Sequence, residues 1–352
     1  MIAYRWVKGE PKPIREIIPV PSPGPGEVLV KVQAAGVCHS DITIMQTDRP
    51  AFFPQWERFT LGHEGAGTIV AVDPSVSQSH PSLKVDTYVA ILGCNPCFER
   101  TCNFCSGGKD QLCRMHPKTT NFPYGLGRDG SWAQYVVVQA ACIIPVPAEG
   151  KAVPPAAIAV STDAVLTPYH ALTTCMRVKS GQTVLVIGSG GGLGLHTIQI
   201  AKNCIGAKVI GCDVRPTALS ESTRLGADFV GRPEDIAEIL QKNSLIVDGV
   251  VDMVATQQSF ELGLTTVKEG GIIHILGLDA EILQVPVRGL MFKDLALQSS
   301  FWGTKQELAE VLEHVAAGRI KPEVETRSME LAGEVLEEMR SGKLKKRVAL
   351  IP

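Results

Sequence analysis

The arrangement of apolar and polar positions changes near Pro154 and divides the chain into two parts. Before Pro154, short runs rich in β-branched residues are separated by turn-forming proline and glycine. The clearest of these runs, at 27–33, 67–72 and 131–138, are predicted to be strands. Short strands with frequent turns indicate an irregular, β-rich domain.

After Pro154, apolar strands alternate with segments of helical character. A helical segment is predicted over 152–174, interrupted at Pro168. Further strands are expected at 183–187, 208–212, 248–254 and 271–276, with helices at 193–204 and 219–225. Because such continuously apolar strands are buried on both faces, the alternation predicts a parallel sheet covered by helices. Beyond about residue 295 we expect one more helix, 306–317, and a terminal strand, 347–351.

Composition narrows the classes of partner. The 352 residues carry a net charge of −2, and the basic run at 343–347 is short. We therefore expect neither nucleic acid nor an anionic membrane as a partner. The amino-terminal residues lack the apolar core of a signal peptide, and no uncharged apolar run reaches about 18 residues. We therefore expect a cytoplasmic protein whose ten cysteines are reduced.

Half of the cysteines lie close together. Successive gaps of two, four, two and seven residues separate Cys94, Cys97, Cys102, Cys105 and Cys113. A Cys-x-x-Cys pair places two thiolates on one side of a tight turn, so two pairs can surround one tetrahedral Zn²⁺. The spacing therefore predicts a zinc-binding loop.

A glycine-rich turn follows the strand at 183–187. It comprises Gly188, Ser189, Gly190, Gly191, Gly192, Leu193 and Gly194. Glycines let the backbone turn sharply and approach a pyrophosphate, which then lies at the start of the following helix. Leu193 occupies the place of the last glycine in Gly-x-Gly-x-x-Gly, so the turn is interpreted as a variant that is one residue longer.

An acid follows the next strand at the distance that a dinucleotide site needs. Asp213 lies 19 residues after Gly194 and can accept hydrogen bonds from the ribose 2′-hydroxyl of NAD. Its charge would repel a 2′-phosphate, which favours NAD over NADP. Arg215, two residues on, weakens that preference.

Two short motifs suggest a second metal site. Cys38 and His39 follow a predicted strand, and His63 and Glu64 lie further along. A thiolate, an imidazole and a carboxylate can hold Zn²⁺ and leave one position open for substrate. Taken alone, however, Cys38 is also compatible with a small buried apolar residue, and His63 with a hydrogen-bonded core histidine.

Taken in order, these motifs resemble those of zinc-dependent alcohol dehydrogenases of the medium-chain dehydrogenase/reductase family. Segments 23–30 and 129–135 also look like family segments, and the likeness runs through nearly the whole chain. The resemblance implies an α/β protein with a GroES-like catalytic domain, 1–155 and 296–352. A Rossmann domain, 156–295, would be inserted before the last segment. The glycine turn looks most similar to that of the yeast-type branch.

The resemblance also implies roles for single residues at the catalytic metal. Cys38 and His63 match the first two zinc ligands, and Glu64 matches an acid beside the metal. Asp163 stands where many relatives have a cysteine ligand, with a helix N-cap as its alternative role. A carboxylate in place of a thiolate should leave the zinc a stronger Lewis acid.

Further roles concern the proton and the cofactor. Ser40 matches the hydroxyl that carries the alcohol proton away, and Thr43 stands where relatives often end that relay with a histidine. His39 matches a contact to cofactor phosphate, and Lys305 resembles a basic pyrophosphate contact. Candidates for an apolar substrate wall are Phe52, Trp56 and Trp302.

For the cysteine loop, the resemblance implies a structural zinc. Cys102, Cys105 and Cys113 keep the last two family gaps, whereas the first family position falls at Glu99. Cys97 is the nearer replacement and Cys94 the alternative. We therefore expect two zinc ions per chain, one catalytic and one structural.

The expected partner is a small alcohol, aldehyde or ketone, and the chain is expected to form a homodimer or homotetramer. Two other interpretations remain at this stage. One is an atypical or zinc-independent reductase of the same family that acts on an activated C=C bond. The other is a non-catalytic protein that binds NAD and zinc in a structural or regulatory role.

Overall fold

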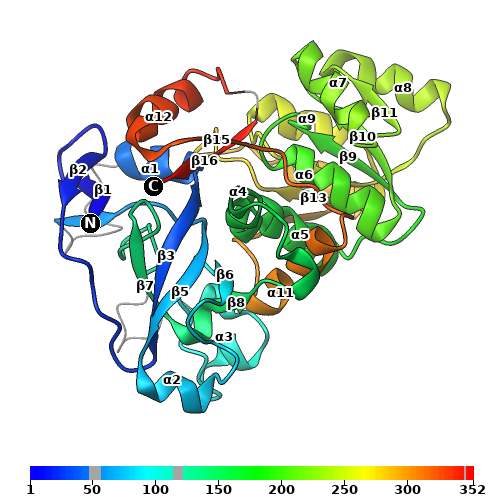
Figure 1. Ribbon diagram of the computed structural model, residues 1–352. Helices are drawn as coiled ribbons and strands as arrows, with labels where there is room; N and C mark the ends of the chain where they lie inside the picture. The colour runs from blue at the N-terminus through cyan, green and yellow to red at the C-terminus, as the bar shows by residue number, and fades with distance from the viewer. Residues whose placement is uncertain (47–56, 114–121, 345) are drawn as a thin grey trace. The chain divides into compact units, whose positions relative to one another are not determined.

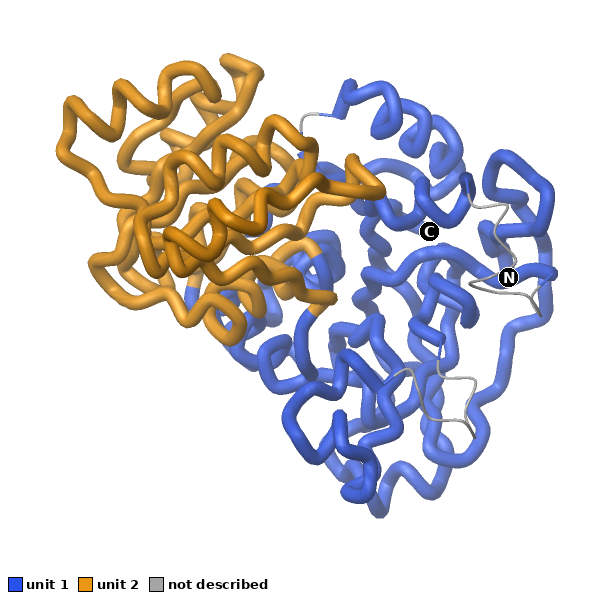
Figure 2. Tube along the Cα trace, turned by 180° about the vertical axis from the view of Figure 1, so that it is seen from behind, with its two compact units in different colours: residues 1–163, 303–317, 322–352 blue, residues 164–302, 318–321 orange. Residues whose placement is uncertain are grey.

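The computed structural model describes residues 1–46, 57–113, 122–344 and 346–352 (Figure 1). The chain divides into two compact units, coloured separately in Figure 2. The first unit consists of residues 1–163, 303–317 and 322–352, and the second of 164–302 and 318–321. The first unit is therefore completed only by segments that follow the main part of the second unit, 164–302, in sequence.

Among the described residues, seven strands form the main sheet of the first unit. Their order is β15 (Val324–Ser328), β16 (Arg347–Ile351), β3 (Glu27–Gly36), β5 (Gly65–Val72), β6 (Tyr88–Ile91) and β8 (Ile143–Pro145), with β7 (Tyr135–Gln139) also paired to β3. Val28 and Val30 of β3 are fully buried, as expected for a central strand. Ala35 pairs with Gly65 in an antiparallel register, so the end of β3 lies beside the start of β5.

A smaller sheet and several helices complete the first unit. The small sheet has the order β2 (Ile14–Ile17), β1 (Ile2–Val7) and β4 (Arg58–Thr60). The helices are α1 (His39–Gln46), α2 (Pro74–Ser79), α3 (Asn103–Ser106), α4 (Pro155–Val160), α11 (Lys305–Ala316) and α12 (Ala332–Arg340). No helix in the described part of the chain has the length and apolarity needed to cross a membrane.

The segment predicted as a helix with a break at Pro168 is continuous. α4 passes into a π-helical stretch, Ser161–Val165, and then into α5 (Leu166–His170), which contains Pro168. A second π-helical stretch, Ala171–Cys175, follows. Proline lacks the N–H that an α-helix needs, and the wider turns on either side accommodate this loss. The predicted interruption is therefore wrong, although irregularity does surround the proline.

The second unit contains a parallel sheet, as the alternating pattern predicted. Within the described residues its order is β11 (Phe229–Gly231), β10 (Lys208–Cys212), β9 (Thr183–Ile187), β12 (Val247–Asp252), β13 (Val267–Ile275) and β14 (Ala296–Ser299). Its helices are α5, α6 (Gly194–Gln199), α7 (Pro216–Arg224), α8 (Ile236–Lys242), α9 (Gln257–Thr266) and α10 (Val287–Lys293). Chain order runs outward in both directions from β9, which is the Rossmann arrangement.

The expectation of a single helix and a single strand after residue 295 is wrong. β14, β15 and α12 lie there in addition to α11 and β16. The apolar face of α12 is formed by Ala332, Val335, Leu336 and Met339. This spacing of three and four residues is the ordinary signature of an amphipathic helix, so the sequence did carry the signal.

A buried histidine makes the stability of the second unit depend on pH. His274 of β13 is fully buried, and its Nε2 lies 2.9 Å from the hydroxyl of Ser300. Burial and the neighbouring His170 lower the pKa of His274 to about 4. Between the ordinary pKa of 6.5 and about 4, the unfolded chain binds a proton that the folded chain does not. Stability is therefore lost as the pH falls through this range.

Replacing His274 by asparagine should remove this part of the pH dependence. From pH 7 to pH 5, the free energy of unfolding of the natural protein should fall by roughly 1–2 kcal/mol more than that of His274→Asn. Urea unfolding at the two pH values measures it, with substitution of the exposed His39 by asparagine as control. An unchanged difference would mean that His274 is protonated equally in both states.

Candidate active site

Four side chains with metal-binding atoms converge in the first unit. Cys38, His63, Glu64 and Asp163 each bring one ligand atom within 4.8 Å of the others. Cys38 follows β3, and His63 and Glu64 precede β5, so the pairing of these two strands brings them together. Asp163 belongs to the π-helical stretch after α4. Three of the four side chains are buried, and Asp163 is partly exposed.

Asp163 lies at the centre of this group. Its Oδ2 is 3.4 Å from the Sγ of Cys38 and 3.6 Å from the Nε2 of His63. A thiolate, an imidazole and a carboxylate in such close contact are ligands that Zn²⁺ accepts. The donor set therefore fits zinc.

Asp41 holds two members of the group in place. One carboxylate oxygen accepts a hydrogen bond from the backbone N–H of Cys38 at 2.8 Å, and the other lies 3.3 Å from the Nδ1 of His63. The Nε2 of His63 is thereby turned towards Asp163. Although burial opposes protonation, the charge of Asp41 and a hydrogen bond to Asp163 raise the pKa of His63 well above its usual value.

Arg347 is a member of the site that was not anticipated from the sequence. It lies at the start of β16, is almost fully buried, and donates hydrogen bonds to Glu64 and, at 3.2 Å, to Asp163. Burial opposes ionisation of Cys38, but Arg347 and His63 together outweigh it and lower the pKa of the thiol. The available signal was a single arginine at the start of an otherwise apolar strand. It was missed because it also ends the basic run 343–347.

The residues expected to handle the proton lie on α1. The Oγ of Ser40 is 3.6 Å from the Sγ of Cys38, beside the metal-binding group. Thr43 is exposed one turn further on, and its hydroxyl donates to the carbonyl of His39 at 3.2 Å. His39 is itself exposed at the start of the helix.

Lys305 lies next to the cysteine loop. It is the first residue of α11, and its backbone N–H donates to Asp110 at 3.0 Å. Its ammonium lies 5.3 Å from the centre of the Phe98 ring. Of the expected apolar wall, Trp302 is buried in the second unit, whereas Phe52 and Trp56 lie outside the described residues.

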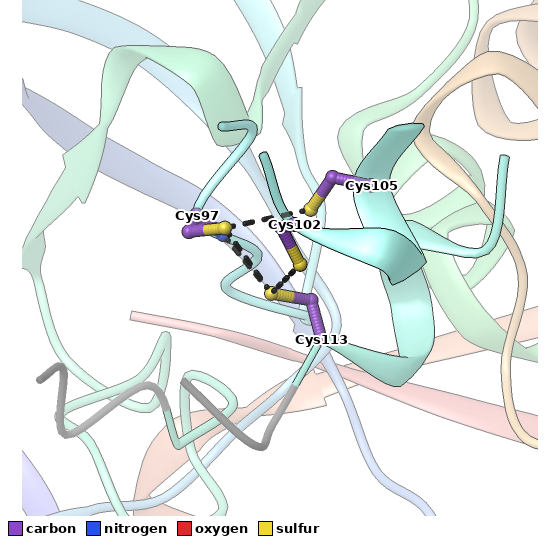
Figure 3. A group of neighbouring side chains, drawn as sticks. All are labelled: Cys97, Cys102, Cys105 and Cys113. Atoms are coloured by element: carbon purple, nitrogen blue, oxygen red, sulfur yellow. Dashed lines mark hydrogen bonds between the residues drawn. The ribbon is translucent and has the colours of Figure 1, made fainter. Parts of the chain in front are cut away.

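The cysteine loop gathers four thiols. Figure 3 shows the sulfur atoms of Cys97, Cys102, Cys105 and Cys113 turned towards one another. The Sγ of Cys113 is 3.4 Å from that of Cys97 and 3.6 Å from that of Cys102. α3 carries Cys105, and the short turn Asp110–Leu112 precedes Cys113. Cys94 is buried outside this group. Four thiols at these distances fit a tetrahedral zinc.

The glycine turn of the second unit connects β9 to α6. Gly188 has a φ of +76°, a conformation that favours glycine. A Cβ on Gly194 would lie 2.3 Å from the carbonyl oxygen of Gly188, so only glycine allows the helix to approach the strand this closely. Gly194 thus performs the packing role that the motif normally gives to its last glycine. The turn fits the diphosphate of a dinucleotide.

Asp213 is tied to this turn. It follows β10, is largely buried, and its Oδ2 accepts a hydrogen bond from the backbone N–H of Gly190 at 3.0 Å. Its other oxygen accepts from the backbone N–H of Arg215 at 3.1 Å. A fixed carboxylate beside the glycine turn is suited to binding ribose hydroxyls.

Comparison with protein families gives two matches. Residues 24–148 match the alcohol dehydrogenase GroES-like domain, and residues 192–317 match the zinc-binding dehydrogenase domain. Together these two ranges include the cysteine loop, Cys38, His63 and the last three residues of the glycine turn, 192–194. Asp163 and Arg347 lie outside both.

Solved structures resemble the chain over its whole length. An acetophenone reductase from Geotrichum candidum, solved in complex with NAD, is 36% identical, with a TM-score of 0.85 and coverage of 100% of this chain and 97% of that chain. An alcohol dehydrogenase from Aeropyrum pernix is 25% identical, with a TM-score of 0.89 and full coverage of both chains. A further NAD-dependent alcohol dehydrogenase is 27% identical, with a TM-score of 0.87 and full coverage of both.

Proposed function

Because the chain belongs to the zinc-dependent alcohol dehydrogenases of the medium-chain dehydrogenase/reductase family, we propose that it interconverts a secondary alcohol and its ketone with NAD(H). The observation that carries the proposal is the largely buried group of Cys38, His63, Glu64 and Asp163. Support for a ketone, and for an aromatic one such as acetophenone, comes from the 36% identical acetophenone reductase.

Cys38, His63 and Asp163 would hold the catalytic zinc. When bound, zinc stabilises negative charge on the substrate oxygen and lowers the pKa of the alcohol, and NAD supplies the hydride acceptor. An ion pair with Arg347 fixes the carboxylate of Glu64 beside the metal ligands. The hydroxyl of Ser40, beside Cys38, would accept the alcohol proton as it gives up its own. Thr43, exposed one turn later, passes that proton to solvent.

The cysteine loop would hold a second, structural zinc. Cys97, Cys102, Cys105 and Cys113 supply four thiolates, which fill a tetrahedral coordination sphere and leave no position for substrate. The role of this zinc is to hold the loop together. Asp110 then links the loop to the start of α11 through the backbone N–H of Lys305.

The reaction can be tested directly with the purified protein. Acetophenone should be reduced with consumption of NADH, and a strong chelator should stop the reaction until Zn²⁺ is restored. Metal analysis should give about two zinc ions per chain. Undiminished turnover after complete removal of the metal would contradict the proposal, and equal turnover of an enone without metal would favour the C=C reductase.

We further propose that the chain forms a homodimer through the edge of its parallel sheet. β14 pairs only with β13 among the described residues, so one side of it presents unpaired backbone groups. Large apolar side chains are exposed in the same stretch of chain, namely Leu278, Ile282, Val287, Met291 and Phe292. Such a concentration is typical of a protein–protein interface. A second copy that pairs along β14 would cover both features.

Charge placed on this surface should separate the subunits. Phe292, which is 83% exposed, is replaced by glutamate, and the molar mass is measured by analytical ultracentrifugation. We expect the natural protein to be a dimer, or a tetramer of two such dimers, and Phe292→Glu to give smaller species. Ile17→Glu is the matched control, since Ile17 is 78% exposed in the first unit. Equal mass for all three proteins would exclude this interface.

A further inference from the structure

Arg215 folds back onto Asp213 and occupies the carboxylate that the cofactor ribose would use. The Nε of Arg215 donates to Oδ1 at 3.1 Å, and its Nη2 donates to Oδ2 at 3.3 Å. Backbone N–H groups of Arg215 and Gly190 donate to the same two oxygens. A carboxylate offers about four acceptor positions, so all of those on Asp213 are filled.

This arrangement sets a condition on NAD binding. A ribose hydroxyl can donate to Asp213 only if the side chain of Arg215 releases it. That release is sterically easy, because the Arg215 side chain is 44% exposed whereas that of Asp213 is 5% exposed. The two backbone donors remain, so Asp213 keeps its place when the guanidinium leaves. Binding of NAD therefore competes with the side chain of Arg215.

The same ion pair has the opposite effect on NADP. While Arg215 stays on Asp213, the charge of the carboxylate is neutralised, and the guanidinium has further N–H groups that can donate to a 2′-phosphate. We propose that Arg215 selects between the cofactors, so that the enzyme accepts both NAD(H) and NADP(H). The arginine moves aside for a ribose diol and stays in place for a 2′-phosphate.

A second arginine near Asp213 is engaged by other groups. Arg232 also approaches the segment, since its Nη2 donates to the carbonyl of Val214 at 3.3 Å. Its Nη1, however, forms an ion pair with Glu234 at 3.3 Å, and its backbone N–H donates a hydrogen bond to the carboxylate of Asp235. The guanidinium of Arg232 is thus held by Glu234 and by the carbonyl of Val214. Among the described residues, Arg215 is the cation whose guanidinium contacts Asp213 directly, so it is the one placed to bind a 2′-phosphate there.

The test measures cofactor binding directly. Dissociation constants for NADH and NADPH are determined by fluorescence titration of the zinc-loaded enzyme and of Arg215→Ala, Arg215→Lys and Arg224→Ala. The last is a matched control, because Arg224 lies on the adjoining helix α7 and pairs with Glu221. Because no substrate is present, the readout does not depend on alcohol turnover.

In the natural enzyme, the dissociation constant of NADPH should lie within about a hundredfold of that of NADH. The reason is that binding of the two cofactors differs by one charge-assisted contact. Arg215→Ala should bind NADH roughly threefold more tightly, as expected when a partly exposed ion pair no longer competes. It should bind NADPH about tenfold or more weakly. Arg215→Lys should keep NADPH binding, because the charge remains, and Arg224→Ala should match the natural enzyme.

The inference rests on the dinucleotide site of the proposed function, and the titration separates the two. If neither cofactor binds any of the proteins, the proposed function itself fails. If NADH binds but NADPH does not, or if Arg215→Ala changes neither constant, Arg215 does not select the cofactor and only this inference is overturned.

Discussion

Replacing Cys38 by alanine should abolish the proposed interconversion of alcohol and ketone and lower the zinc content by about one ion per chain. The variant removes the only thiolate of the catalytic group and leaves His63 and Asp163, with Glu64 held by Arg347, too few strong ligands to retain the metal. We expect turnover to fall by at least about a thousandfold, since charge stabilisation at the substrate oxygen is lost.

Two measurements distinguish this outcome from general damage. NADH fluorescence should be unchanged in Cys38→Ala, because the glycine turn and Asp213 belong to the second unit. Cys94→Ala is a matched control, since Cys94 is likewise buried but lies outside both metal-binding groups. A Cys38→Ala protein that kept its full zinc content would show that this residue is not a ligand.

Replacing Arg347 by methionine should destabilise the protein by about 3–5 kcal/mol, because it leaves the buried carboxylate of Glu64 without its counter-charge. The loss should be visible as a lower midpoint of urea unfolding in the zinc-loaded protein. Much of it should be recovered in the double variant Arg347→Met with Glu64→Gln, where the remaining partner is neutral.

The comparison with an exposed ion pair makes the result specific. Arg327 is partly exposed and pairs with Glu325 and Glu338, so Arg327→Met should cost less than about 1 kcal/mol. If Arg347→Met proved no more harmful than Arg327→Met, Glu64 would have to be neutral or solvated in the folded protein. Failure of Glu64→Gln to restore stability would instead place the cost at Asp163.

Local pattern was sufficient to predict much of the second unit. The strands 183–187 and 208–212 are observed with those limits, because each is a short, mostly apolar run that begins two residues after a glycine. The short strands β6 and β8 were not predicted, since three or four residues give too little pattern to recognise. The amphipathic pattern of α12 was present and was missed.

Only those site residues that stand in short, local sequence motifs could be proposed from the sequence pattern itself. Cys38 and His63 stand in short motifs, and Asp163 could be proposed only through the family resemblance. Arg347 was not foreseen because its contacts are set by the pairing of β16 with β3, between segments far apart in sequence. Pairings over such separations depend on the whole fold, and a single sequence carries no local sign of them.

The position of Arg347 has a consequence for how the protein is made. Its guanidinium is synthesised 184 residues after Asp163, which at ordinary rates of translation is a delay of roughly 10–40 s. For most of that delay the first unit also lacks β15, and for all of it β16. The second unit is almost contiguous in sequence, so we expect it to fold on the ribosome while the half begun earlier still waits for its last strands.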